Sequence, residues 1–176
     1  MTSIKVPLIM TAAMGASDFA WADRLRRRHF PPERNLVPAH ITLFHHLPPG
    51  LLAETVERIR SVSREYARPH AMLDHVMKFS SGVAFRILSP ELDTIRSDLA
   101  DQFHGMLTPQ DQAPPRLHIT VQNKARSDEA KALYEALAKG FEPRPLVIVG
   151  LSLYAYRNGP WEPLGSWSFR GRHRHQ

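Results

Sequence analysis

The tripeptide His-Ile-Thr occurs twice in this chain of 176 residues, at residues 40–42 and again at residues 118–120. Histidine titrates near neutral pH, so one imidazole can accept a proton while a second one donates a proton in the same reaction. Threonine hydroxyls can donate hydrogen bonds to phosphoryl oxygens, on which negative charge builds up in the transition state. The two copies together therefore predict acid–base chemistry on a phosphodiester, a chemistry for which we expect neither a metal ion nor another cofactor.

Each copy lies in a short apolar run that predicts a β-strand. Because side chains alternate between the two faces of a strand, His40 and Thr42 share one face of the first strand. His118 and Thr120 share one face of the second strand in the same way. The isoleucines between them point to the opposite face, which suits a buried core. We expect these four polar side chains, the predicted catalytic residues, to line one cleft.

Two further side chains are predicted to contact a substrate. Arg116 lies two residues before His118 and shares its face, where a guanidinium can bind phosphoryl oxygens in a bidentate manner. Phe44 lies on the face of the first-strand histidine, where an aromatic ring either contacts the substrate or packs in the core. Gln122 occupies the corresponding place on the second strand, so the two strands differ here. Other aromatic candidates lie on later strands: Tyr154, Tyr156 and Trp161.

Positive charge is concentrated in two arginine clusters. Of the 23 basic residues 18 are arginine, and the formal net charge is +6. The clusters consist of Arg24, Arg26, Arg27 and Arg28, and of Arg170, Arg172 and Arg174. Without these seven charges the net charge would be −1, which argues against a large surface for duplex nucleic acid and favours local contacts to a phosphorylated substrate. The alternative is a solvated helix face and a disordered tail.

The composition also bounds the class of protein. The chain has no cysteine, which excludes disulfides, thiolate nucleophiles and zinc–thiolate sites, and we expect a cytoplasmic protein. No apolar run reaches the roughly 18 to 20 residues that span a bilayer, so we expect no membrane partner. Residues 1–14 are predicted to form a first strand rather than a signal peptide. No segment has the pattern of a coiled coil, and we expect a monomer.

Apolar spacing, capping residues and turn residues predict the order of the elements. Strands are predicted over residues 4–13, 40–47, 71–79, 83–88, 117–123, 146–156 and 161–169. Helices are predicted over residues 17–30, 51–67 and 129–141, and another begins at Ser89-Pro90. Residues 80–82 are predicted to be the turn of a β-hairpin, and residues 108–115 a loop.

This order predicts a single α+β domain over residues 1–170. It consists of two similar lobes, approximately residues 1–80 and 81–170, each a mainly antiparallel sheet with outer helices, around a central cleft. Residues 171–176 are expected to be a basic tail.

The paired motifs resemble those of the 2H phosphoesterase superfamily, which is also described as the 2′-5′ RNA ligase-like and cyclic phosphodiesterase family. Its signature is two H-x-[ST]-hydrophobic motifs about 80 residues apart, which correspond here to residues 40–43 and 118–121. The resemblance extends over residues 4–169. It implies the bilobal fold and metal-free hydrolysis of a cyclic phosphodiester, commonly a 2′,3′-cyclic phosphate of RNA or of a nucleotide. It implies acid and base roles for the histidines and phosphate binding by the threonines. RNA-acting members carry an arginine where Arg116 stands, and several carry an aromatic near the cleft that stacks on a base, for which Phe44 is the candidate.

The motifs do not select among RNA ends, cyclic nucleotides and ADP-ribose cyclic phosphate, nor do they establish whether 2′-5′ ligation occurs. Two other functions stay open. A metal site could use His40, His45 and His46, or the C-terminal pair His173 and His175, although no acidic residues cluster with them in the sequence. A binding module could recognise an RNA end or a cyclic nucleotide without turnover.

Overall fold

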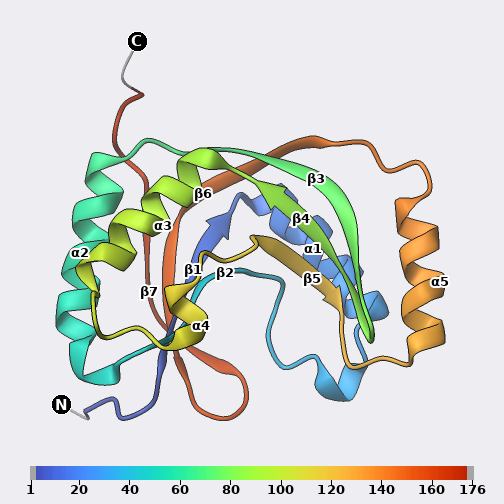
Figure 1. Ribbon diagram of the computed structural model, residues 1–176, viewed down its shortest axis with the longest axis horizontal. Helices are drawn as coiled ribbons and strands as arrows, with labels where there is room; N and C mark the ends of the chain where they lie inside the picture. The colour runs from blue at the N-terminus through green and yellow to red at the C-terminus, as the bar shows by residue number, and fades with distance from the viewer. Residues whose placement is uncertain (1–2, 174–176) are drawn as a thin grey trace.

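The computed structural model describes residues 3–173, which form a seven-stranded antiparallel sheet with helices around it (Figure 1). The strands are β1 (Leu8–Met14), β2 (Ile41–Leu47), β3 (His70–Phe79), β4 (Gly82–Leu88), β5 (His118–Gln122), β6 (Arg144–Tyr156) and β7 (Trp161–Ser168). The helices are α1 (Ala16–His29), α2 (Leu52–Glu65), α3 (Pro90–Gln102), α4 (Pro109–Gln112) and α5 (Ser127–Ala138), with 3₁₀ turns at Pro32–Arg34 and Pro49–Leu51. The predicted α+β class is confirmed.

The strand order is β2-β1-β6-β3-β4-β5, and β7 also pairs with β6. β6 is shared by the two halves of the sheet, because its residues 144–147 pair with β3 whereas residues 148–155 pair with β1. The two strands that carry the His-Ile-Thr motifs, β2 and β5, lie at opposite ends of this order. The sheet curves so strongly that these ends approach each other in the middle of the molecule (Figure 1).

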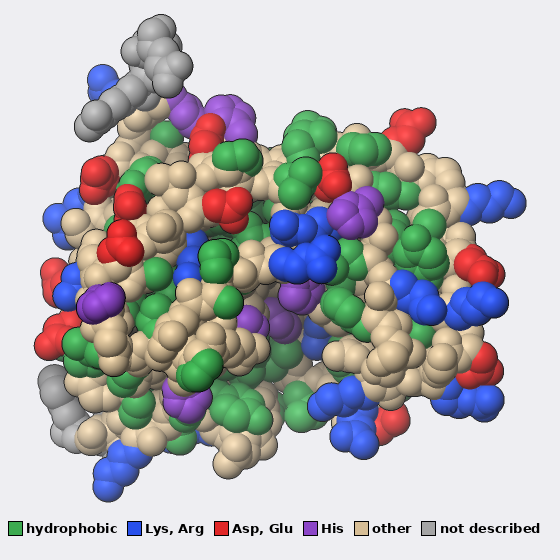
Figure 2. Space-filling view, in the orientation of Figure 1, with side chains coloured by type: hydrophobic (Ala, Val, Ile, Leu, Met, Phe, Trp, Pro, Cys, Tyr) green, Lys and Arg blue, Asp and Glu red, His purple; other side chains and the backbone are tan. Residues whose placement is uncertain are grey.

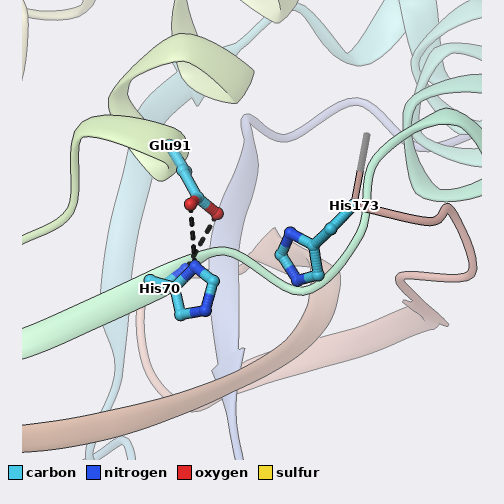
Figure 3. A group of neighbouring side chains, drawn as sticks. All are labelled: His70, Glu91 and His173. Carbon is cyan, nitrogen blue, oxygen red and sulfur yellow. Dashed lines mark hydrogen bonds and ion pairs between the residues drawn. The ribbon is translucent and has the colours of Figure 1, made fainter. Parts of the chain in front are cut away.

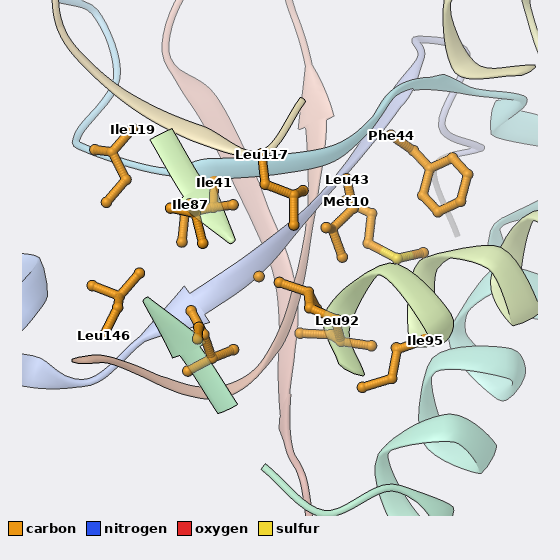
Figure 4. Close-up of a cluster of buried hydrophobic side chains, with 14 of the residues drawn as sticks. Met10, Ile41, Leu43, Phe44, Ile87, Leu92, Ile95, Leu117, Ile119 and Leu146 are labelled. Atoms are coloured by element: carbon orange, nitrogen blue, oxygen red, sulfur yellow. The ribbon is translucent and has the colours of Figure 1, made fainter. Parts of the chain in front are cut away.

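A single hydrophobic core lies under both motif strands. Ile41 and Ile119, the central residues of the two tripeptides, are fully buried in it together with Leu43 and Leu117 (Figure 4). Burial of a side chain of this size stabilises a fold by about 1.5–3 kcal/mol. α1 packs near β5, α5 packs near β3 and β4, and α3 packs near β3. The apolar face of each motif strand is therefore anchored, which holds the opposite face in place.

Local sequence signals explain two element boundaries, the β3–β4 turn and the start of α3. The Ser80-Ser81 turn joins β3 to β4 as the predicted hairpin. Ser89 caps α3, since its hydroxyl oxygen accepts a hydrogen bond from the backbone N–H of Leu92 at 3.1 Å. The same hydroxyl donates to the carbonyl oxygen of His70 at 2.6 Å, which ties the start of α3 to the start of β3.

Ser17 and Asp18 open the helix predicted over residues 17–30 and could have capped it, but neither does so. α1 begins after Gly15, and no side chain caps it. The Asp18 carboxylate instead accepts hydrogen bonds from the backbone N–H of Val147 and from the guanidinium of Arg144, both at 2.8 Å. A capping residue in the sequence thus serves a tertiary contact between α1 and β6.

Two other expectations need correction. The predicted loop over residues 108–115 contains the short helix α4. A lobe boundary near residue 80 does not match the pairing, because it falls inside the β3–β4 hairpin and because β6 and β7 return to pair beside β1. One half of the sheet is β2-β1-β6-β7, and the other is β3-β4-β5 with the first residues of β6.

Among the helices between residues 3 and 173, none has the length and apolar character that crossing a membrane requires.

Candidate active site

The two predicted catalytic histidines lie on the strands at the two ends of the sheet order, His118 at the start of β5 and His40 immediately before β2. Residues of β2 and β5 are in contact, although the two strands share no ladder. The positive charge of a protonated His118 lowers the pKa of His40, so the two rings lie within electrostatic range of each other. The face of the molecule in Figure 2 is hollowed at its centre, and histidine side chains gather in that hollow.

Both imidazoles are oriented by the same local contact. His40 Nδ1 lies 2.8 Å from the carbonyl oxygen of Pro38, and His118 Nδ1 lies 2.6 Å from the carbonyl oxygen of Arg116. A carbonyl oxygen only accepts, so Nδ1 must carry the hydrogen in each ring. The neutral tautomer therefore has an unprotonated Nε2, which is the atom that can take up or deliver a proton.

The environment of His40 favours the neutral ring. Burial lowers the pKa of His40 to about 4, although the hydrogen bond to Pro38 opposes this shift. The positive charges of Arg26, His118 and His45 lower it further. In the free protein His40 is therefore an uncharged imidazole at neutral pH, which is the form required of a general base.

Arg26 connects the two halves of the site, a role that the sequence analysis did not foresee. Its guanidinium is buried, with 4% of the residue exposed, and its Nη1 donates to the carbonyl oxygen of Thr120 at 3.0 Å. Its Nε donates to Asn35 at 2.8 Å, and the guanidinium lies over the ring of Phe30. Burial lowers the pKa of Arg26 to about 10, with Asp23 opposing the shift, so it stays charged at neutral pH. The other three arginines of its cluster are exposed, as a solvated helix face predicts.

A cavity of about 350 Å³ lies beside His40. Trp161 and Tyr154, two of the aromatic candidates from the sequence, line it together with Phe19. The ring of Trp161 lies 4.5 Å from the His40 ring and 5.5 Å from the Tyr154 ring, measured between centroids. The third candidate, Tyr156, is exposed and lies outside this lining. The cavity has the aromatic surface that a planar ring can stack on.

The prediction that Phe44 stacks on a base is wrong. Phe44 is 0% exposed, packs against Phe103, and has the Arg96 guanidinium over its ring. The reason is a β-bulge: Thr11 pairs with Thr42, but the preceding residue of β1, Met10, pairs with Phe44, so β2 contains one extra residue. The bulge shifts the alternation of faces and turns Phe44 into the core.

The second motif strand has a bulge at the same place. Ala84 pairs with Thr120 and Val83 pairs with Gln122, so Val121 is the extra residue. Gln122 is consequently buried, with 5% exposed, rather than directed to the cleft, and its Oε1 has no hydrogen-bond partner among the described residues. On both strands, therefore, the residue two positions after the threonine, which regular alternation would direct to the cleft, is buried instead.

Asp111 fixes the far end of β2, and it too was missed in the sequence. Its carboxylate is buried and accepts hydrogen bonds from the backbone N–H groups of His45 and His46, at 2.9 and 2.8 Å. The imidazole of His45 lies 3.2 Å from the same carboxylate. Burial alone would raise the pKa of Asp111, but these hydrogen bonds outweigh it and the pKa lies below its ordinary value.

Arg96 also holds this segment, because its guanidinium donates to the Asp111 carbonyl oxygen and to that of Leu43. From the sequence, the segment that contains Asp111 was predicted only as a loop, over residues 108–115.

The remaining predicted residues differ in their exposure to solvent. Thr42 and Thr120 are half-buried on their strands, and Arg116 is exposed at the entrance to β5. The metal site suggested by His40, His45 and His46 is not formed, since within residues 3–173 the only group of three ligands close enough to hold an ion lies elsewhere, at His70, Glu91 and His173. His175 and Arg174 lie outside the described residues.

This curved antiparallel sheet with paired His-x-Thr strands defines a class of α+β protein, the 2H phosphoesterases. The sequence model of the 2′-5′ RNA ligase superfamily matches residues 15–160, and the chain belongs to this superfamily. No curated protein matched the chain.

Solved structures share the fold at low sequence identity. TT0787 of Thermus thermophilus is 18% identical with a TM-score of 0.66, over 95% of this chain and 100% of that chain. LigT of E. coli in complex with NADP⁺ is 20% identical with a TM-score of 0.60, over 94% and 98%. LigT of E. coli in complex with 3′-AMP is 21% identical with a TM-score of 0.55, over 93% and 98%.

Proposed function

We propose that this protein hydrolyses a cyclic phosphodiester without a metal ion, and that the substrate is a 2′,3′-cyclic phosphate of an RNA end or a nucleotide. The observation that carries the proposal is the matched pair of imidazoles on β2 and β5, each with Nδ1 held by a carbonyl and Nε2 free. Membership of the superfamily supports a phosphoesterase-type enzyme. The nucleotides bound by LigT, 3′-AMP and NADP⁺ among them, support a nucleotide-like substrate.

In this proposal His40 is the base and His118 the acid, because the low pKa of His40 favours its neutral form. Neutral His40 takes a proton from water as the water oxygen attacks phosphorus. The bond from phosphorus to one ribose oxygen breaks, and that oxygen takes a proton from protonated His118. Thr42 and Thr120 donate to the non-bridging oxygens, and Arg116 adds a charge-assisted contact. The aromatic cavity beside His40 accepts the base.

A product-resolved assay in EDTA tests the proposal. The substrates are 2′,3′-cyclic nucleotides, RNA with a cyclic-phosphate end, and ADP-ribose cyclic phosphate, with the His104→Ala protein as a control because His104 is exposed in the turn after α3. We expect turnover of at least one substrate in EDTA, with a phosphomonoester product. Loss of turnover on chelation would support a metal enzyme instead, and tight binding without product would support a binding module.

A further inference from the structure

Three potential metal ligands converge on the surface at a corner of the fold that the catalytic proposal does not use. His70 begins β3, Glu91 lies in the first turn of α3, and His173 follows β7 in the C-terminal segment (Figure 3). Each side chain offers one ligand atom, and these atoms all lie within 4.8 Å of one another. None of the three residues lines the cavity beside His40.

Two of the ligands are held in position by the backbone. The Glu91 carboxylate accepts from the backbone N–H of His70 at 3.0 Å and lies 2.8 Å from His70 Nδ1. Ser89, the cap of α3, donates to the His70 carbonyl oxygen. His70 and Glu91 are therefore fixed to each other before any ion binds, which lowers the entropic cost of forming a site.

The third ligand is brought in by an anchored segment. The backbone N–H of Arg170 donates to the Ser63 carbonyl oxygen at 2.7 Å, and that of Gly171 donates to the Tyr66 carbonyl oxygen at 3.0 Å. A Cβ on Gly171 would lie 2.2 Å from the Glu65 carbonyl oxygen, so only glycine permits this approach. The segment is thereby directed towards His70, and the rings of His70 and His173 have centroids 4.9 Å apart.

The donor set selects the kind of ion. Two imidazoles and one carboxylate suit Zn²⁺ and related transition metals, whereas Ca²⁺ and Mg²⁺ require mostly oxygen ligands. Tetrahedral Zn²⁺ with bonds of about 2.0–2.1 Å separates its ligand atoms by roughly 3.3 Å. The distance of 2.8 Å between Glu91 and His70 Nδ1 and the outer limit of 4.8 Å bracket this value, and all three side chains are exposed to solvent.

We propose that His70, Glu91 and His173 form a binding site for a divalent transition metal ion, Zn²⁺ in the first place, with water completing the coordination. The ion would join the C-terminal segment to the β3–α3 corner. Its binding free energy would add to the stability of the native state.

Calorimetric titration of the metal-free full-length protein with ZnCl₂ tests the site. The variants are His70→Ala, Glu91→Gln and His173→Ala, and the matched control is His75→Ala, because His75 forms a similar exposed pair with Asp74 at 2.7 Å but has no third ligand among the described residues. We expect one equivalent of Zn²⁺ to bind, each ligand variant to weaken binding at least tenfold, and the control to bind as the unmodified protein does.

Unfolding temperatures measured without and with Zn²⁺ show whether a variant is folded and whether the ion stabilises it. We expect Zn²⁺ to raise the unfolding temperature of the unmodified protein and of His75→Ala, and to have little effect on the ligand variants. Absence of binding at about 100 μM Zn²⁺ would overturn the proposal. Binding that only His173→Ala weakens would also overturn it, since the C-terminal segment alone would then hold the ion.

Discussion

The two motif strands differ in how the fold holds them, although their chemistry is matched. β2 is fixed at its far end by a buried anion, since the Asp111 carboxylate accepts from two of its backbone N–H groups. β5 is fixed by a buried cation, since the Arg26 guanidinium donates to the Thr120 carbonyl oxygen. A strand at the end of a sheet has unpaired backbone groups of both kinds, and each strand here uses a partner of the appropriate sign.

The difference extends to the histidines. His40 lies beside an aromatic cavity with a pKa lowered by burial, whereas His118 contacts the edge of the Phe79 ring and is paired across the ladder with Arg86. Equivalent motifs in two halves of one sheet have thus acquired different surroundings. This is what a reaction that needs one base and one acid requires.

Removal of either histidine is expected to have the largest effect. His40→Ala and His118→Ala should each lower kcat by about 10²- to 10⁴-fold, because each removes one proton transfer. The double variant should be little slower than the slower single variant, since the two groups act as a unit. Steady-state kinetics with circular dichroism as a check of folding measure this. A His118→Ala protein with near-normal activity would show that the histidines are not a catalytic pair.

Substitution of Arg26 should affect stability more than any other change in its cluster. Arg26→Met leaves the Thr120 carbonyl and the Asn35 side chain without their donor, and we expect a loss of about 1–3 kcal/mol in the free energy of unfolding. Arg28→Met on the same helix is the control, expected to change it by less than about 0.5 kcal/mol because Arg28 is exposed. Urea unfolding followed by fluorescence distinguishes them, and equal effects would mean that Arg26 does not bridge the halves.

The lowered pKa of His40 predicts two pH dependences. The value of kcat/KM should fall as pH decreases through about 4, because His40 then becomes protonated and cannot act as a base. It should fall again at higher pH, because the group that protonates the leaving oxygen must itself carry a proton, which gives a bell-shaped profile. A profile with no fall on the alkaline side would show that the reaction needs no protonated general acid.

The same group also affects stability. Because the pKa of His40 is about 4 in the folded protein and 6.5 in the reference state, the unfolded chain binds more protons between these values. The free energy of unfolding should therefore decrease as pH falls from about 6.5 to about 4 and be unaffected by His40 above that range. In urea titrations at pH 7 and pH 4.5, His40→Gln should show a smaller decrease than the unmodified protein. An identical decrease would contradict the lowered pKa.

The smallest expected effect concerns the positions that follow the bulges. Phe44 is an apolar residue packed in the core, whereas Gln122 has a buried Oε1 with no partner among the described residues. Gln122→Met should therefore leave the free energy of unfolding unchanged or raise it by up to about 1 kcal/mol. A loss above about 2 kcal/mol in urea unfolding would show that the amide has a structural role.

The sequence alone predicted the α+β class, most elements and the placement of the isoleucines, since periodicity and turn residues depend on local physics. It could not predict that Phe44 and Gln122 are buried, because a bulge depends on how two strands pair. Arg26 and Asp111 were missed for a related reason. Each is one charged residue among many, and only the tertiary fold buries it against a backbone group that is distant in the sequence. The division of the sheet at β6 could not be predicted either, because it depends on β6 pairing with both β1 and β3, which are distant from it in the sequence.

The position of β6 also bears on the order in which the molecule can be completed during synthesis. β1 and β2 can pair with each other, and β4 can pair with both β3 and β5, while the chain is still growing. The two groups have no common ladder until residues 144–156 have emerged from the ribosome. A nascent chain stalled before residue 144 holds both histidines but lacks the strand that joins the two groups, so we expect the two motif strands to be joined in one sheet only after β6 has been made.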